Sequence, residues 1–97
     1  MKQVTVGAIK RLMKRMPIAV KKEGKRTKSK HTDIRMRSYT RIAKLTRLTG
    51  ELGRAVAAHM GGSIDDILTH VSPDVTIEDE RIIKAYVEMK ALIDIIR

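Results

Sequence analysis

Positive charge is concentrated in the first half of this 97-residue chain, and this asymmetry restricts how the chain can fold. Residues 1–47 contain 16 lysines and arginines against two acids, Glu23 and Asp33, a net charge of +14. Residues 48–97 contain five basic residues against nine acids, a net charge of −4. A field this one-sided attracts polyanions and holds them by counterion release. We therefore expect the basic half to bind phosphate and the second half to supply a helical core or an assembly surface.

The length and composition set further limits. A chain of 97 residues forms one small domain, which buries only about 60–65% of its unfolded surface, so we expect a partner to stabilise it. Because the chain has no cysteine, disulfides and thiolate zinc sites are excluded. No apolar run approaches the roughly 18–20 residues that span a bilayer. These features predict a cytoplasmic or nucleoid-associated protein with no membrane span.

The basic half divides into a helix and an arm. Residues 7–16 place Ile9 and Leu12 at helical spacing opposite lysines and arginines, which predicts a short cationic helix that ends near Pro17. The run over 21–30 has no apolar residue, which predicts a flexible basic arm. We accordingly divide the chain into a basic N-terminal helix and arm over 1–31 and a helical domain over 32–97.

The spacing of apolar residues changes in the centre of the chain, from alternation to the helical period. Residues 32–38 alternate, with Ile34 and Met36 on one side and arginines on the other, which predicts a strand. A second, very short strand candidate covers 3–6. Leucines at helical spacing then predict a helix over about 39–60, with a possible break at Gly50 and Gly53.

Two further helices are predicted in the acidic half. Ser63 is placed to cap a short helix over 64–70, after Gly61 and Gly62 end the previous one. Thr76 is expected to start the last helix, with Asp79 completing a variant of the capping box. The predicted fold class is mainly α, a small domain of three or four helices with at most one short strand.

The order of strand and helix over 32–60 resembles the ribbon-helix-helix family of DNA-binding dimers. The resemblance implies a strand at 32–38 that pairs with its twin, with Asp33, Arg35 and Arg37 reading the major groove. The first helix would follow from the Ile42 to Leu52 pattern. Gly61 and Gly62 depart from the family's pattern, because they would cut the second helix short. This fold is the alternative to a simple helical domain.

The strongest candidate site is a stripe of basic residues along the central helix, formed by Arg37, Arg41, Lys44, Arg47 and Arg54. Arginines suit phosphate because the planar guanidinium can donate two hydrogen bonds to it. The chain has only two aromatic residues, Tyr39 and Tyr86, which argues against modules that stack successive bases. The predicted nucleic-acid contacts are Lys10, Arg11, Lys14, Arg15, Lys25, Arg26, Lys28, Lys30, Arg35, Arg37, Arg41, Lys44 and Arg47.

The last helix carries more apolar residues than one contact stripe requires, together with several acids that phosphate would repel. This favours an assembly surface formed by Ile82, Ile83, Tyr86, Val87, Leu92 and Ile95.

The three histidines lie too far apart for a metal motif, so we predict no metal, no cofactor and no catalytic residue.

These features favour a non-enzymatic DNA-binding protein of accessory or regulatory type. We expect it to be a homo-oligomer or a part of a larger assembly. Three alternatives remain open: an RNA-binding or ribonucleoprotein component, a protein-assembly subunit that docks through its last helix, and a membrane-surface peptide over 1–20.

Overall fold

The protein is mainly helical, as predicted, and it is described here from a computed structural model that covers residues 1–96. The helices are α1 (Val6–Arg26), α2 (Thr32–Met60), α3 (Ile64–His70) and α4 (Glu80–Ile95). The strands β1 (Val4–Thr5) and β2 (Thr76–Ile77) form a two-stranded antiparallel sheet in which Val4 pairs with Ile77.

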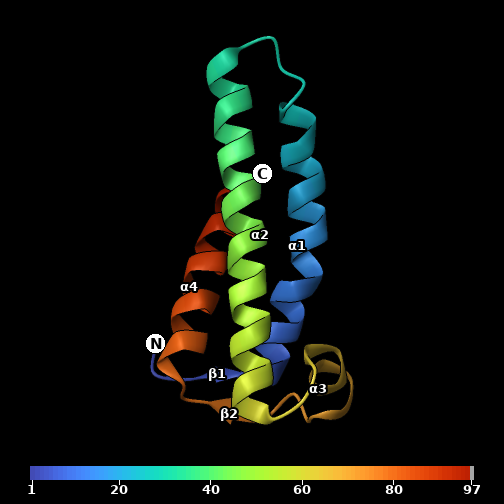
Figure 1. The fold of residues 1–97 in the computed structure, drawn as a ribbon, viewed down its shortest axis with the longest axis vertical. Coiled ribbons are helices and arrows are strands. Elements are labelled where there is room, and N and C mark those ends of the chain that lie inside the picture. The colour runs from blue at the N-terminus through green and yellow to red at the C-terminus, as the bar shows by residue number, and fades with distance from the viewer. Residues whose placement is uncertain (97) are drawn as a thin grey trace.

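The helices α1 and α2 form a long antiparallel hairpin, and α4 packs along its lower part (Figure 1). The connection between α1 and α2 therefore projects beyond the end of α4, whereas the sheet and α3 close the opposite end. The molecule is elongated, with Cα extents of 45 × 23 × 19 Å.

The leucine pattern of the central helix forms the core, as predicted. Leu45, Leu48, Leu52 and Val56 of α2 are fully buried, and they pack with apolar residues of all the other elements. Burying each such side chain contributes about 1.5–3 kcal/mol, so α2 is the element around which the fold is organised. No helix within residues 1–96 is both long enough and apolar enough to cross a bilayer.

Two predictions for the basic half are wrong. The first helix does not end near Pro17 but continues to Arg26, so residues 21–26 belong to α1 and are not a flexible arm. Proline in a helix interior costs about 3 kcal/mol, but Ala19 and Glu23 on the same face are buried after it. Packing of the second half of α1 therefore overrides the local signal.

The strand predicted at 32–38 is also wrong, because these residues form the first turns of α2. Ser38 lies on the buried face of the helix, whereas Met36, expected on the core side of the strand, is 60% exposed. The ribbon-helix-helix alternative fails with this strand. The break expected at Gly50 and Gly53 does not occur either, since α2 runs unbroken to Met60.

In the acidic half, α3 begins at the predicted cap, whereas α4 begins later than predicted. Ser63 caps α3 as predicted, since its hydroxyl accepts a hydrogen bond from the Asp66 backbone at 3.2 Å. Thr76, in contrast, lies in β2, and Asp79 itself caps α4 by accepting from the Arg81 backbone at 2.9 Å. The short strand expected at 3–6 is present as β1.

Candidate nucleic-acid interface

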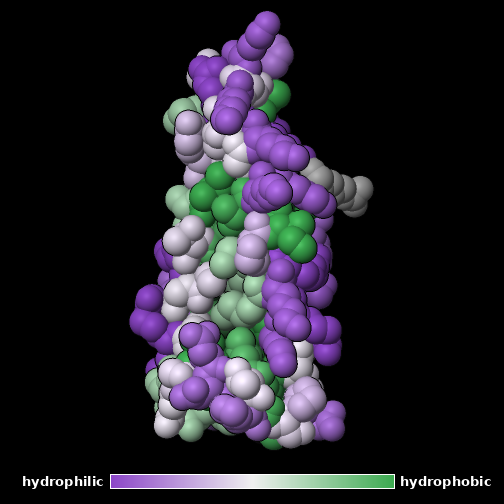
Figure 2. Space-filling view, turned by 90° about the vertical axis from the view of Figure 1, so that its right-hand side faces the viewer, coloured by the Kyte–Doolittle hydropathy of each residue, from purple (hydrophilic) through white to green (hydrophobic). Residues whose placement is uncertain are grey.

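The outward face of α1 carries the densest group of basic side chains. Ile9, Leu12 and Ala19 point into the core, so the opposite side of α1 faces solvent. Five basic residues on this side are exposed and a sixth, Lys10, is half-buried. We call this surface the α1 basic face: Lys10, Arg11, Lys14, Lys21, Lys22 and Lys25. Seen from the side of α1, hydrophilic side chains run along most of the molecule beside a column of apolar atoms (Figure 2).

The one acid of α1 does not weaken this face, because Glu23 is fully buried on the opposite side. Its two carboxylate oxygens accept hydrogen bonds from Arg26 at 2.6 Å and from Arg41 of α2 at 3.0 Å. Burial raises the pKa of Glu23, but the hydrogen bonds and positive charges of Arg26 and Arg41 outweigh that effect and hold the pKa below its ordinary value. Glu23 therefore stays ionised and joins α1 to α2.

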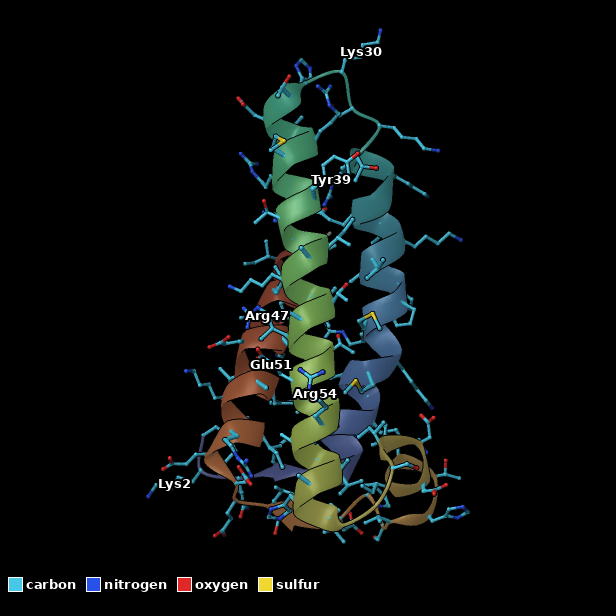
Figure 3. All side chains as sticks on the ribbon, viewed as in Figure 1. Lys2, Lys30, Tyr39, Arg47, Glu51 and Arg54 are labelled. Atoms are coloured by element: carbon cyan, nitrogen blue, oxygen red, sulfur yellow. The ribbon has the colours of Figure 1, made fainter. Side chains whose placement is uncertain are left out.

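The connection between α1 and α2 is held by hydrogen bonds within the tip of the hairpin. The guanidinium of Arg35 donates to the Ser29 carbonyl at 2.7 Å and to the Thr32 hydroxyl at 3.1 Å. Lys28 and Lys30 are exposed on the same turn, and Lys30 extends away from the helices (Figure 3). The tip therefore presents two free lysines, while Arg35 holds the turn in place.

The C-terminal part of the basic stripe of α2 lies on the side of α4. Arg47, Glu51 and Arg54 follow one another along α2 (Figure 3) and line a groove of about 710 Å³ between α2 and α4. Arg37 and Arg41 line a smaller hollow nearer the tip, together with Ile34 and Ile95. Arg26 of α1 also lines this hollow, and Arg41 reaches Glu23 of α1, so only the part of the stripe at Arg47 and Arg54 lies on the side away from α1.

Ion pairs occupy only a minority of the basic residues in the first half. Four of the 16 form ion pairs, which are Arg15 with Asp94 at 2.6 Å, Arg26 and Arg41 with Glu23, and Arg47 with Glu51 at 2.8 Å. The other twelve form none within residues 1–96. Arg15 and Arg41, both predicted phosphate contacts, are therefore joined to other helices, whereas Arg26, also a predicted contact, pairs with Glu23 within α1.

Sequence reasoning missed four basic residues of these surfaces. Lys21 and Lys22 continue the α1 basic face, and the helical period beyond Pro17 was the signal that could have found them. Arg81 and Lys84 of α4 complete the wall of the groove opposite Arg47 and Arg54. They could not be found from the sequence, since only the packing of α4 on α2 brings them there.

The six residues predicted for assembly divide into two groups. Ile82, Tyr86 and Leu92 are buried within the chain and Ile83 packs against the same core, whereas Val87 and Ile95 are 44% and 56% exposed. The apolar surface of α4 is broad because α4 packs against two helices, α1 and α2. Assembly through the remaining exposed residues stays a prediction.

Other site types have little support in the described part of the chain. Residues 1–96 contain no group of three histidine or acidic side chains that could hold a metal ion. His59 lies 3.4 Å from the Asp79 carboxylate, close to the start of α4.

Comparison of the chain with protein-family models, with curated proteins and with solved structures finds no match.

Proposed function

We propose that this protein binds DNA, chiefly by placing the α1 basic face against the phosphate backbone. The observation that carries the proposal is that the basic and acidic residues of α1 lie on opposite sides of the helix. Its outward side holds six basic residues, while its only acid is buried and paired with two arginines. An ordinary solvated helix face mixes both signs of charge, whereas the outward side of α1 carries one sign, and Asp65 of α3 is the acid that lines a hollow with its Lys10 and Lys14.

The geometry of this face suits an extended backbone. Lys10 and Lys25 are separated by 15 residues of helix, about 22 Å at 1.5 Å per residue. The helix fixes the backbone of these lysines before binding, so only their side chains need ordering when phosphates arrive. The face can therefore contact several consecutive phosphates at once.

The scarcity of exposed aromatic side chains favours binding of duplex over binding of single strands. Tyr86 is buried in the core, which leaves Tyr39 of α2 as the only exposed aromatic side chain. Proteins that bind single strands usually stack several bases on aromatic side chains. Contacts to the phosphates, without stacking, are the readout that this surface can provide, and they carry no sequence information by themselves.

The test compares two charge-matched variants by fluorescence anisotropy with a labelled duplex. Lys21→Gln with Lys25→Gln removes two charges from the α1 basic face, and we expect at least a tenfold loss of affinity. Lys2→Gln with Lys90→Gln removes two charges elsewhere on the exposed surface, and we expect less than a threefold loss. Equal losses in the two variants would mean that only net charge matters and would overturn the proposed site.

A structured RNA and a single-stranded DNA of equal length complete the experiment. We expect the duplex DNA to bind more tightly than the single strand, because stacking contacts are lacking. An RNA that binds at least tenfold more tightly than the DNA duplex would replace the proposal with the ribonucleoprotein alternative, since basic helices that bind RNA have the same composition.

A further inference from the structure

The basic residues form two surfaces on opposite sides of the molecule. The helices α1, α2 and α4 all contact one another, so the groove between α2 and α4 lies on the far side of the bundle from α1. No residue of α1 lines this groove. The α1 basic face points in the opposite direction, and the body of the bundle, with short Cα extents of 23 and 19 Å, separates the two.

The groove between α2 and α4 is suited to an anion. Its walls carry four basic side chains, Arg47 and Arg54 from α2 and Arg81 and Lys84 from α4, against the two acids Glu51 and Glu88. Three alanines also line the groove, and their short side chains take up little of its space. This positive groove includes residues of α4, although the second half of the chain is acidic as a whole.

Two of these basic groups are available to a ligand. Arg47 is paired with Glu51 and Arg81 with Asp79, whereas Arg54 and Lys84 form no ion pair within residues 1–96. The guanidinium of Arg54 lies along α2 over Gly50, where a Cβ atom would stand 3.0 Å from its Nη1. Gly50 thus leaves room for Arg54 to take this position.

We infer that the groove between α2 and α4 is a second phosphate site and that one molecule of the protein bridges two segments of nucleic acid. This inference rests on the proposed function, because the first segment occupies the α1 basic face. One short duplex cannot serve both surfaces, since it would have to turn back around a body about 20 Å thick. The persistence length of DNA, about 150 base pairs, opposes so tight a turn.

The experiment measures capture of one duplex by another. An unlabelled 25-base-pair duplex is fixed to beads, the protein is added, and retention of a second, labelled duplex is counted after washing. We expect the wild type to retain the labelled duplex. A wild type that binds the fixed duplex but retains none of the second would overturn bridging and leave the proposed function standing. A wild type that binds no duplex at all would overturn both.

Variants then identify the second surface. Arg54→Gln with Lys84→Gln should lower capture at least fivefold while single-duplex affinity, measured by anisotropy, changes less than threefold. The charge-matched control, Lys2→Gln with Lys90→Gln, should retain capture. Because a self-associated protein could bridge through two α1 basic faces, undiminished capture by the groove variant would show that route and overturn the inference. Circular dichroism confirms that each variant is folded.

Discussion

Removing Arg41 should destabilise the protein, because it leaves the buried Glu23 carboxylate with one partner instead of two. We consider Arg41→Met, which keeps the length and apolar stem of the side chain and deletes only its charge and hydrogen bonds. Arg41 donates to Glu23 at 3.0 Å across the interface between α1 and α2. The Glu23 side chain is 1% exposed, so water cannot replace the lost donor without a rearrangement of the helices.

The expected cost is about 2 kcal/mol. A hydrogen bond to a charged group contributes about 1.5–3 kcal/mol, and leaving a buried charge without any partner costs about 3–5 kcal/mol. The lower figure applies here for two reasons. Arg26 still holds the second carboxylate oxygen at 2.6 Å, and Arg41 itself is 26% exposed. For a domain of this size, 2 kcal/mol corresponds to a decrease in Tm of about 8–16 °C.

The assay is urea unfolding followed by circular dichroism at pH 7, with Arg37→Met as the matched control. Arg37 lies one turn before Arg41 on α2, is exposed, and forms no ion pair within residues 1–96, so the control should change stability by less than about 0.5 kcal/mol. An Arg41→Met variant as stable as Arg37→Met would refute the role that we assign to Glu23.

The ion pair of Glu23 with Arg41 also predicts how the stability of the protein depends on pH. The pKa of Glu23 is lowered below its ordinary value of 4.5 by Arg26 and Arg41. Its contribution to stability is therefore present at neutral pH and is lost as the pH falls below about 4.5 through the folded-state value. We expect Glu23→Gln to remove this part of the acid destabilisation. An unchanged slope of stability against pH between 5 and 3 would contradict the assignment.

Three further predictions concern helix ends, glycines and assembly. Gly53→Ala should stabilise the protein by about 1 kcal/mol, since the added Cβ would meet no described atom within 4 Å beyond its own stretch of backbone. Gly61→Ala should destabilise the protein by about 1–2 kcal/mol because the φ of Gly61 is 75°. Thermal unfolding that shifts the stability of both variants in the same direction would contradict this. Thr5→Val should cost about 1 kcal/mol, because the Thr5 hydroxyl caps α1 by accepting from the Ala8 backbone at 3.0 Å, and an unchanged urea midpoint would argue against the cap. Light scattering should give the wild type a mass above the monomer, and the joint change of Val87 and Ile95 to Gln should return it to the monomer; a monomeric wild type would refute assembly through α4.

Local signals predicted the second half of the chain better than the first. The leucines of α2 and the Ser63 cap act within one or two helical turns, so their consequences can be derived from spacing alone. The continuation of α1 past Pro17 depends instead on Glu23, whose partner Arg41 is 18 residues away. A charged residue in a basic run carries no local sign that it will be buried.

The candidate site was predicted only in part, because local sequence patterns reveal some of its residues and tertiary packing brings the others together. Lys10 and Lys14 belong to a helical pattern that is visible in the sequence, and they lie on the α1 basic face. The strand assigned to residues 32–38 hid the inward role of Arg35, which holds the hairpin turn. The groove between α2 and α4 could not be predicted, because Arg54 and Lys84 meet only through tertiary packing.

The salt dependence of duplex binding tests the central claim most directly. If the six residues of the α1 basic face each contact a phosphate, the slope of log affinity against log salt concentration should be about −5. The Lys21→Gln, Lys25→Gln variant should reduce that slope by about 2, because each lost phosphate contact removes about one. A wild-type slope shallower than about −2, or the same slope in the variant, would contradict binding through this face.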